Sequence, residues 1–145
     1  MLGKASMLRI RSLLSDGKFW SGVLAAASLS RGTAFIERPP PNDTVASGAI
    51  EAFIDYQAWG ILLLLTSAGI ALGYMHRSLH PVGIVAHLVS IVAYGTFAIS
   101  TAVAAIAFGQ SWSALGLYFT QVVLHVACAI FLGDEIGRKR EVAVE

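Results

Sequence analysis

The chain has 145 residues, enough for one domain, and a formal net charge of +1. Hydrophobic residues make up 56% of it and charged residues 13%, whereas soluble domains average roughly 45–50% and about 25%. From Ala58 to Gly133 the single formal charge is Arg77, and a soluble domain of this size lacks the volume to bury so long an apolar run. The composition excludes an ordinary soluble protein and predicts a single integral membrane domain over residues 1–145.

Residues 1–18 combine basic residues with apolar ones at short intervals. This pattern is typical of a short amphipathic segment on an anionic membrane surface, and a plain basic tail is the alternative. The apolar part of the following segment, Phe19–Ser30, has about 12 residues, fewer than the roughly 20 that span a bilayer. It is compatible with a cleaved secretory signal or with a retained span over residues 19–36.

We favour the retained span for two reasons. Arg31 and Arg38 lie near its outer end, where a long side chain can reach the headgroups. Small residues also recur on one face of this segment and would allow another helix to approach closely. These small residues are Ser21, Ala25, Ser28 and Gly32.

Residues 37–57 form the largest polar loop. Three successive prolines from Pro39 prevent a continuous helix. The apolar residues that follow, between Ala46 and Ile54, repeat at helical spacing with acidic residues among them. We therefore expect a short interfacial helix that lies on the membrane in this first outer loop.

Three more apolar segments complete an all-α, polytopic membrane protein with a four-transmembrane-helix bundle. We expect these spans over residues 58–74, 82–108 and 113–132. The third span of the bundle, 82–108, is longer than a bilayer is thick and should tilt. One face of the second span carries small residues that favour close helix packing, namely Thr66, Gly69 and Gly73.

The distribution of basic residues predicts the orientation. They gather in segment 1–18, in the hinge at 76–81 and in the C-terminal tail, whereas the loop at 37–57 is acidic. By the positive-inside rule, both termini and the hinge lie in the cytoplasm and the acidic loop lies outside. We expect a multi-pass protein of the inner (cytoplasmic) membrane, in which the hinge histidines His76 and His80 are solvated.

Polar side chains mark one stripe on each of the last three spans. Because polar groups are costly in lipid, such stripes are either packing faces or functional sites. The stripe residues are Thr66, His87, Ser90, Tyr94, Thr101, Gln121 and His125. We favour stripes that face one another and form hydrogen bonds across the bundle. A water-lined lumen formed on assembly is a second interpretation, and haem b with His87 and His125 as axial ligands is a third.

No residue pattern supports an enzyme. The chain has no Ser/His/Asp set, no paired intramembrane carboxylates and no glycine-rich phosphate loop. Its one cysteine, Cys128, excludes an internal disulfide and a multi-cysteine metal site. We expect no catalytic residues, no metal site and no nucleic-acid partner. The expected partners are the lipid bilayer and either further copies of the chain or a larger membrane complex.

Residues 9–32 contain Arg9–Leu14, Lys18–Trp20, a helix of small residues and then Ser30–Gly32. This arrangement resembles small membrane proteins encoded by phages of actinobacteria, which have three or four spans, a proline-containing outer loop and a short charged tail. Some of them are assigned as holins, which accumulate in the inner membrane and open it. The resemblance implies no functional residue, because these proteins share no active-site motif.

We accordingly expect a non-enzymatic, holin-like membrane permeabiliser that associates with itself through its small and polar faces. One alternative is an accessory or anchor subunit of a larger membrane complex. The other is a haem-binding membrane anchor that uses His87 and His125. Self-assembly with leakage, co-purification with a partner and a Soret absorption band would distinguish these three hypotheses.

Overall fold

The structure, a computed structural model, describes residues 16–37, 55–109 and 111–142. Within these ranges the chain is helical and has no strands, so the predicted all-α class is confirmed. The elements are α2 (Gly17–Glu37), α4 (Tyr56–Met75), the 3₁₀ helix η1 (Arg77–Leu79), α5 (His80–Phe108) and α6 (Ser113–Val142). The expected interfacial helix of the outer loop, and nearly all of the expected N-terminal amphipathic segment, lie outside the described residues.

Three of the described helices are long and apolar enough to cross a membrane. They are α4, the continuous segment of η1 and α5, and α6 as far as Gly137. The prediction that the three later apolar runs form membrane-capable helices is confirmed. α2 has a comparable length of 21 residues, but Lys18, Arg31 and several serines make it less apolar.

The helix boundaries follow from local residue preferences. Pro81 lies in the first turn of α5, where its missing N–H leaves no hydrogen bond unmade. Gly109 ends α5 with a left-handed φ of 65°, a conformation that glycine adopts without steric cost. α6 continues to Val142, beyond the span end that we expected at Leu132, and therefore carries Glu135 on the helix.

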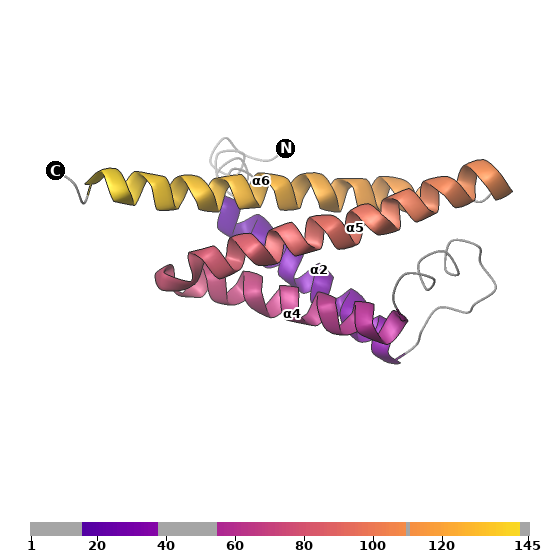
Figure 1. Cartoon of the computed structure of the whole chain (residues 1–145), viewed down its shortest axis with the longest axis horizontal. Coiled ribbons are helices and arrows are strands. Elements are labelled where there is room, and N and C mark those ends of the chain that lie inside the picture. The colour runs from indigo at the N-terminus through magenta and orange to yellow at the C-terminus, as the bar shows by residue number, and fades with distance from the viewer. Residues whose placement is uncertain (1–15, 38–54, 110, 143–145) are drawn as a thin grey trace, which may run out of the picture.

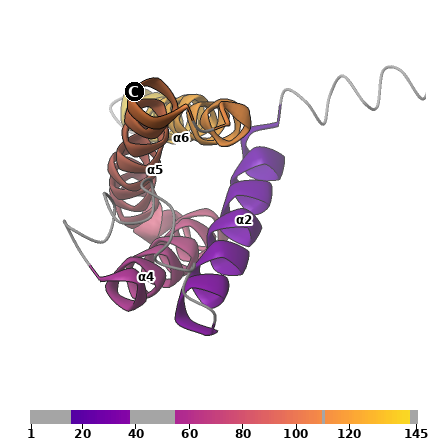
Figure 2. The same cartoon turned by 90° about the vertical axis from the view of Figure 1, so that its right-hand side faces the viewer.

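The four long helices pack into a bundle in which α2 runs obliquely to the others. α4 packs against α2 and α5, and α5 packs against α6 (Figure 1). Viewed from one end, the order around the bundle is α2, α4, α5, α6, and α6 meets α2 again (Figure 2). This last contact is the least extensive of the four. We call it the α2–α6 seam, where Arg31 of α2 faces Tyr118 of α6.

Glycines set the closest approaches between helices. A Cβ atom on Gly32 of α2 would lie 2.8 Å from the carbonyl oxygen of Gly60 in α4. A Cβ atom on Gly73 of α4 would lie 2.5 Å from the Cα atom of Gly83 in α5. Because no side chain fits at these positions, the backbones touch, as they do where small residues join membrane helices.

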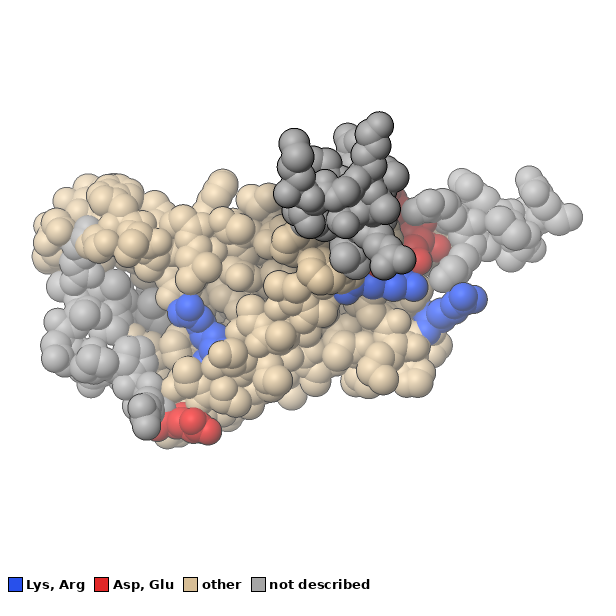
Figure 3. Space-filling view, turned by 180° about the vertical axis from the view of Figure 1, so that it is seen from behind, with Lys and Arg blue, Asp and Glu red and all other residues tan. Residues whose placement is uncertain are grey.

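The interior and the exterior of the bundle differ from those of a soluble protein. Aromatic rings of α2, α4 and α5 form a buried core at one end of the bundle, which includes Phe35, Trp59 and Phe97. Large apolar side chains cover the outside, such as Ile99, which is 68% exposed, and Ile106, which is 76% exposed. On the face shown in Figure 3, few charged side chains interrupt an otherwise uncharged surface. An apolar exterior of this kind suits a lipid environment.

Candidate functional site

A histidine pair lies at the centre of the bundle. His87 of α5 and His125 of α6 have no exposed surface, and their Nδ1 atoms are 2.8 Å apart. This hydrogen bond requires one Nδ1 to carry a proton and the other to accept it. The Nε2 atom of His87 lies 3.4 Å from the hydroxyl of Ser21 in α2, so three helices meet at the pair.

The surroundings of the pair favour one arrangement of protons. The Nε2 atom of His125 is buried and has no hydrogen-bond partner. A buried N–H without a partner is rarer than an unpaired acceptor, so we assign the bare nitrogen to this position. His125 then donates from Nδ1 to His87, and His87 donates from Nε2 to Ser21. The hydrogen bonds therefore run from α6 through α5 to α2.

Tyr94 extends this network toward the aromatic core. Its ring stacks on His125 with centroids 5.5 Å apart and an interplanar angle of 20°. Its hydroxyl lies 3.2 Å from that of Ser28 in α2. Tyr94 thus links the polar centre to α2 by a second hydrogen bond. The stacked rings of Tyr94 and His125 also fill the space between α5 and α6.

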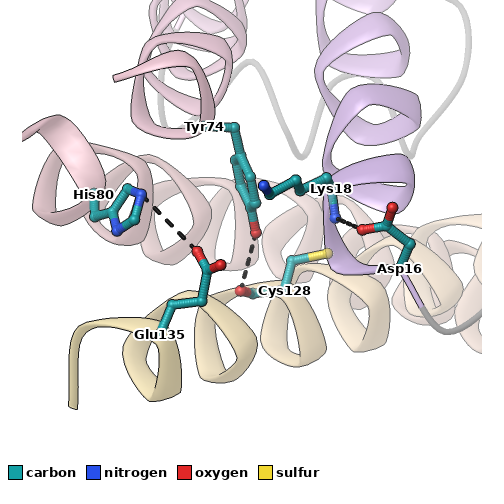
Figure 4. Close-up of polar contacts among 6 residues, drawn as sticks. All are labelled: Asp16, Lys18, Tyr74, His80, Cys128 and Glu135. Atoms are coloured by element: carbon teal, nitrogen blue, oxygen red, sulfur yellow. Dashed lines mark hydrogen bonds and ion pairs between the residues drawn. The ribbon is translucent and has the colours of Figure 1, made fainter. Parts of the chain in front are cut away.

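Polar contacts also gather where α4, α5 and α6 meet near the start of α5 (Figure 4). Tyr74 donates from its hydroxyl to the carbonyl oxygen of Cys128, at 3.4 Å. His80 Nε2 lies 3.9 Å from a carboxylate oxygen of Glu135. The prediction that His80 is solvated is wrong, because only 4% of it is exposed. The cause is the length of α6, which brings Glu135 alongside the first turn of α5.

A cavity of about 370 Å³ opens at the α2–α6 seam. Arg31 donates to the Tyr118 hydroxyl at 2.7 Å, and its guanidinium carbon lies 5.0 Å from the centroid of the Tyr118 ring. Gln121 lines the same cavity, and its side-chain oxygen is buried without a hydrogen-bond partner. Tyr94 of α5 also lines the cavity, so residues of three helices enclose it. We refer to it as the seam cavity.

The structure places the sequence-predicted residues in three groups. The first group takes part in hydrogen bonds between helices and comprises Ser21, Ser28, His87, Tyr94 and His125. The second group is satisfied within its own helix, because Thr66 donates to Leu63 and Thr101 donates to Phe97. The remaining residues occupy helix contacts, the seam cavity or unpaired buried positions, and they are Ala25, Gly32, Gly69, Gly73, Ser90 and Gln121.

Several residues of the network were not anticipated from the sequence. Tyr74, Ser67 and Tyr118 each donate or accept a hydrogen bond between helices. A signal for Tyr118 was present, since it precedes Gln121 by three residues and belongs to the same helical face. Ser67 bonds the carbonyl oxygen of Ala25 at 2.8 Å, a backbone partner that side-chain patterns do not reveal.

The direct contact of the two histidines bears on the haem hypothesis. Axial ligation would place an iron and its flat porphyrin between His87 and His125. Their Nδ1 atoms are in hydrogen-bond contact and their ring centroids are 5.1 Å apart, so the rings occupy the space that the porphyrin requires. This conformation does not fit haem. Among the described residues there is also no group of three or more His, Cys, Asp or Glu side chains that could hold a metal ion.

Comparison with protein-family models, with curated proteins and with solved structures finds no match. The sequence and the geometry of the bundle are therefore the basis for inferring function. Together they describe an all-helical chain with three membrane-capable helices, a polar centre and a charged seam cavity. These features are compatible with a small integral membrane protein.

Proposed function

We propose that this protein is a holin-like, non-enzymatic permeabiliser of the inner membrane. In this proposal α2, α4, α5 and α6 all span the bilayer, and both termini lie in the cytoplasm. One observation carries it: the polar side chains gather inside a single chain, behind the weakly closed α2–α6 seam, while the exterior is apolar. A bundle of this kind can insert in lipid with its polar groups hidden and expose them when the seam opens.

The geometry of α2 supports its role as the first span. Its 21 residues extend about 31 Å at 1.5 Å per residue, close to the roughly 30 Å of a bilayer core. Its polar side chains Ser21 and Ser28 are buried toward α5. Phe19, Val23 and Leu29 are exposed and would face lipid.

Few side-chain hydrogen bonds hold α2 against α5 and α6, and one of them, from Arg31 to Tyr118, crosses the seam itself. Three hydrogen bonds join side chains of α2 to α5 or α6, and they involve Ser21, Ser28 and Arg31. Hydrogen bonds between membrane helices contribute about 0.6 kcal/mol each, so the three together contribute about 2 kcal/mol. Such a small free energy allows α2 and α6 to exchange these partners for those of a neighbouring copy, so that the polar faces line water.

Dye leakage from liposomes tests the proposal, and a cross-link tests the role of the seam. The thiol of Cys128 on α6 lies 3.9 Å from the carbonyl oxygen of Gly17 in α2, one helical turn before Ser21, so Ser21→Cys supplies a second thiol at this contact for a cross-link between α2 and α6. We expect the oxidised variant to leave liposomes sealed and the reduced variant to release dye. Ser21→Cys combined with Cys128→Ser cannot form this cross-link and serves as the control. Equal leakage from the oxidised and reduced forms would refute seam opening, and no leakage from the wild type would refute permeabilisation.

One observation favours a second candidate, an anchor or accessory subunit. Only 17% of the membrane-capable window of α6 is buried, against 39% for α4 and 44% for the η1–α5 segment. The outward face of α6, which includes Phe119, Val123 and Ile130, could therefore hold another membrane protein. Co-purification of a second chain at fixed stoichiometry would support this candidate, whereas a homo-oligomer in native mass measurements would support the permeabiliser.

A further inference from the structure

We infer that the seam cavity binds the headgroup of one phospholipid that carries both a negative charge and hydroxyl groups, as phosphatidylglycerol does. The cavity lies between α2 and α6, with Tyr94 of α5 as its third side. Its volume of about 370 Å³ is within the usual range for small-molecule sites. This inference requires only that the chain be embedded in a membrane, and it does not depend on pore formation.

Arg31 supplies the positive charge. Its guanidinium group has five N–H donors, of which the structure shows one bonded, to the Tyr118 hydroxyl. Among the described residues no carboxylate lies within 4.0 Å of it. A guanidinium at a helix contact in lipid without a counter-ion is costly, and phosphate oxygens match its planar donor geometry. The charge of the site therefore favours an anionic phosphate.

Gln121 adds a second requirement. Gln121 lines the cavity. Its side-chain oxygen is buried and receives no hydrogen bond, and a buried acceptor left in this state costs free energy. A phosphate diester offers only acceptors, so it cannot satisfy this oxygen. A hydroxyl next to the phosphate can donate to it. Together, the charge of Arg31 and the unpaired oxygen of Gln121 select a headgroup that has both a phosphate and hydroxyls.

The remaining walls suit the glycerol backbone and the first carbons of a lipid. Ala27 and Ala34 of α2 and Leu117 of α6 line the cavity with small or apolar surface. The cavity is partly open, so the acyl chains can stay in the bilayer while the headgroup enters. Basic pockets between membrane helices bind anionic headgroups in this manner.

Native mass spectrometry can test this site with three lipids of matched acyl chains in equal amounts. Phosphatidylglycerol has the charge and the hydroxyl donors, phosphatidylmethanol has the charge without the donors, and phosphatidylethanolamine has a donor without net charge. We expect the protein released from such bilayers to retain one phosphatidylglycerol, at least about tenfold above phosphatidylethanolamine. Phosphatidylmethanol should fall between them. Equal retention of phosphatidylglycerol and phosphatidylethanolamine by the wild type would overturn the inference.

Two variants and a matched control assign the selectivity to the site. Arg31→Gln should abolish the preference for the anionic lipids. Gln121→Leu should keep the preference over phosphatidylethanolamine but make phosphatidylglycerol equal to phosphatidylmethanol. Arg77→Gln, which removes an exposed charge of η1, should change neither. Circular dichroism confirms that each variant is helical, and if Arg31→Gln does not fold, the comparison made with Gln121→Leu decides alone.

Two other outcomes would also overturn the proposed site. Loss of selectivity in Arg77→Gln equal to that in Arg31→Gln would show a general surface effect of charge. Full competition by free glycerol phosphate, at the same concentration as the lipid, would identify a soluble phosphate ligand in place of a lipid. Retained lipid selectivity in a protein that leaks no dye would leave this inference standing while refuting the permeabiliser, so the two proposals fail separately.

Discussion

The contact of α4 with α5 at Gly73 yields a prediction that the structure makes quantitative. In Gly73→Ala the new methyl group would lie 2.5 Å from the Cα atom and 2.7 Å from the nitrogen of Gly83. Non-bonded carbon atoms normally approach to about 3.5–4.0 Å, so the two helices must separate by about 1 Å at this point. Both atoms belong to the backbone, so no side-chain rotation can relieve the overlap.

The size of the effect follows from two opposing contributions. Overpacking a close contact typically costs about 1–3 kcal/mol. Replacing glycine by alanine within a helix gains about 0.5–1 kcal/mol. We therefore expect Gly73→Ala to lower the free energy of unfolding by about 1–2 kcal/mol. Gly95 of α5 has no atom near enough to meet an added Cβ, so Gly95→Ala should be neutral or stabilising and is the matched control.

Titration of the detergent-solubilised protein with sodium dodecyl sulfate, followed by far-UV circular dichroism, measures both variants. The midpoint for Gly73→Ala should fall below that of the wild type, and the midpoint for Gly95→Ala should not. Coincident midpoints for the two variants would refute the conclusion that backbone contact at Gly73 holds α4 against α5.

Three further predictions concern the polar centre and the seam. Replacing either His87 or His125 by leucine leaves the other histidine buried with an unmade hydrogen bond and should lower the free energy of unfolding by about 1–3 kcal/mol. In the sodium dodecyl sulfate titration, the double variant should lose less stability than the sum of the two single variants. Because the two rings touch, the purified protein should show no Soret band, and a band lost in His87→Ala would contradict the described conformation. Gln121→Leu should shift the oligomer distribution in native mass measurements more than Thr120→Leu, since Gln121 lines the seam and Thr120 is exposed and bonded to its own helix; equal shifts would argue against the seam.

The main features of the fold could be predicted because they depend on composition along the chain. In lipid, a single long uncharged segment can form all of its backbone hydrogen bonds only as a helix. The lengths of the uncharged segments therefore predict α4, α5 and α6. The turn at Pro81 and the end at Gly109 follow from backbone preferences. The length of α6 was harder, because Gly133 and the charges after it are typical of a helix end, yet the helix continues through them.

The polar face of each helix could be predicted from the sequence, but the hydrogen-bond partners between helices could not. Helical spacing places His87, Tyr94 and His125 on polar stripes, but it does not say which atoms of different helices meet. Contact between His80 and Glu135 depends on how far α6 extends past the bundle, a property of tertiary structure. Gly60 and Gly83 are unpredictable for a related reason, since spacing within one helix does not show which glycine of a neighbouring helix it meets.

The hydrogen bonds of α2 have a consequence for biogenesis. Ser21, Ser28 and Arg31 find their partners in His87, Tyr94 and Tyr118, all of which are synthesised after α2. Of the described helices, the first to leave the ribosome is thus the last to have these polar side chains paired. A nascent chain that stops after α4 would contain the glycine contact between α2 and α4 but none of these hydrogen bonds. All three bonds of α2 can therefore form only after α6 has been synthesised.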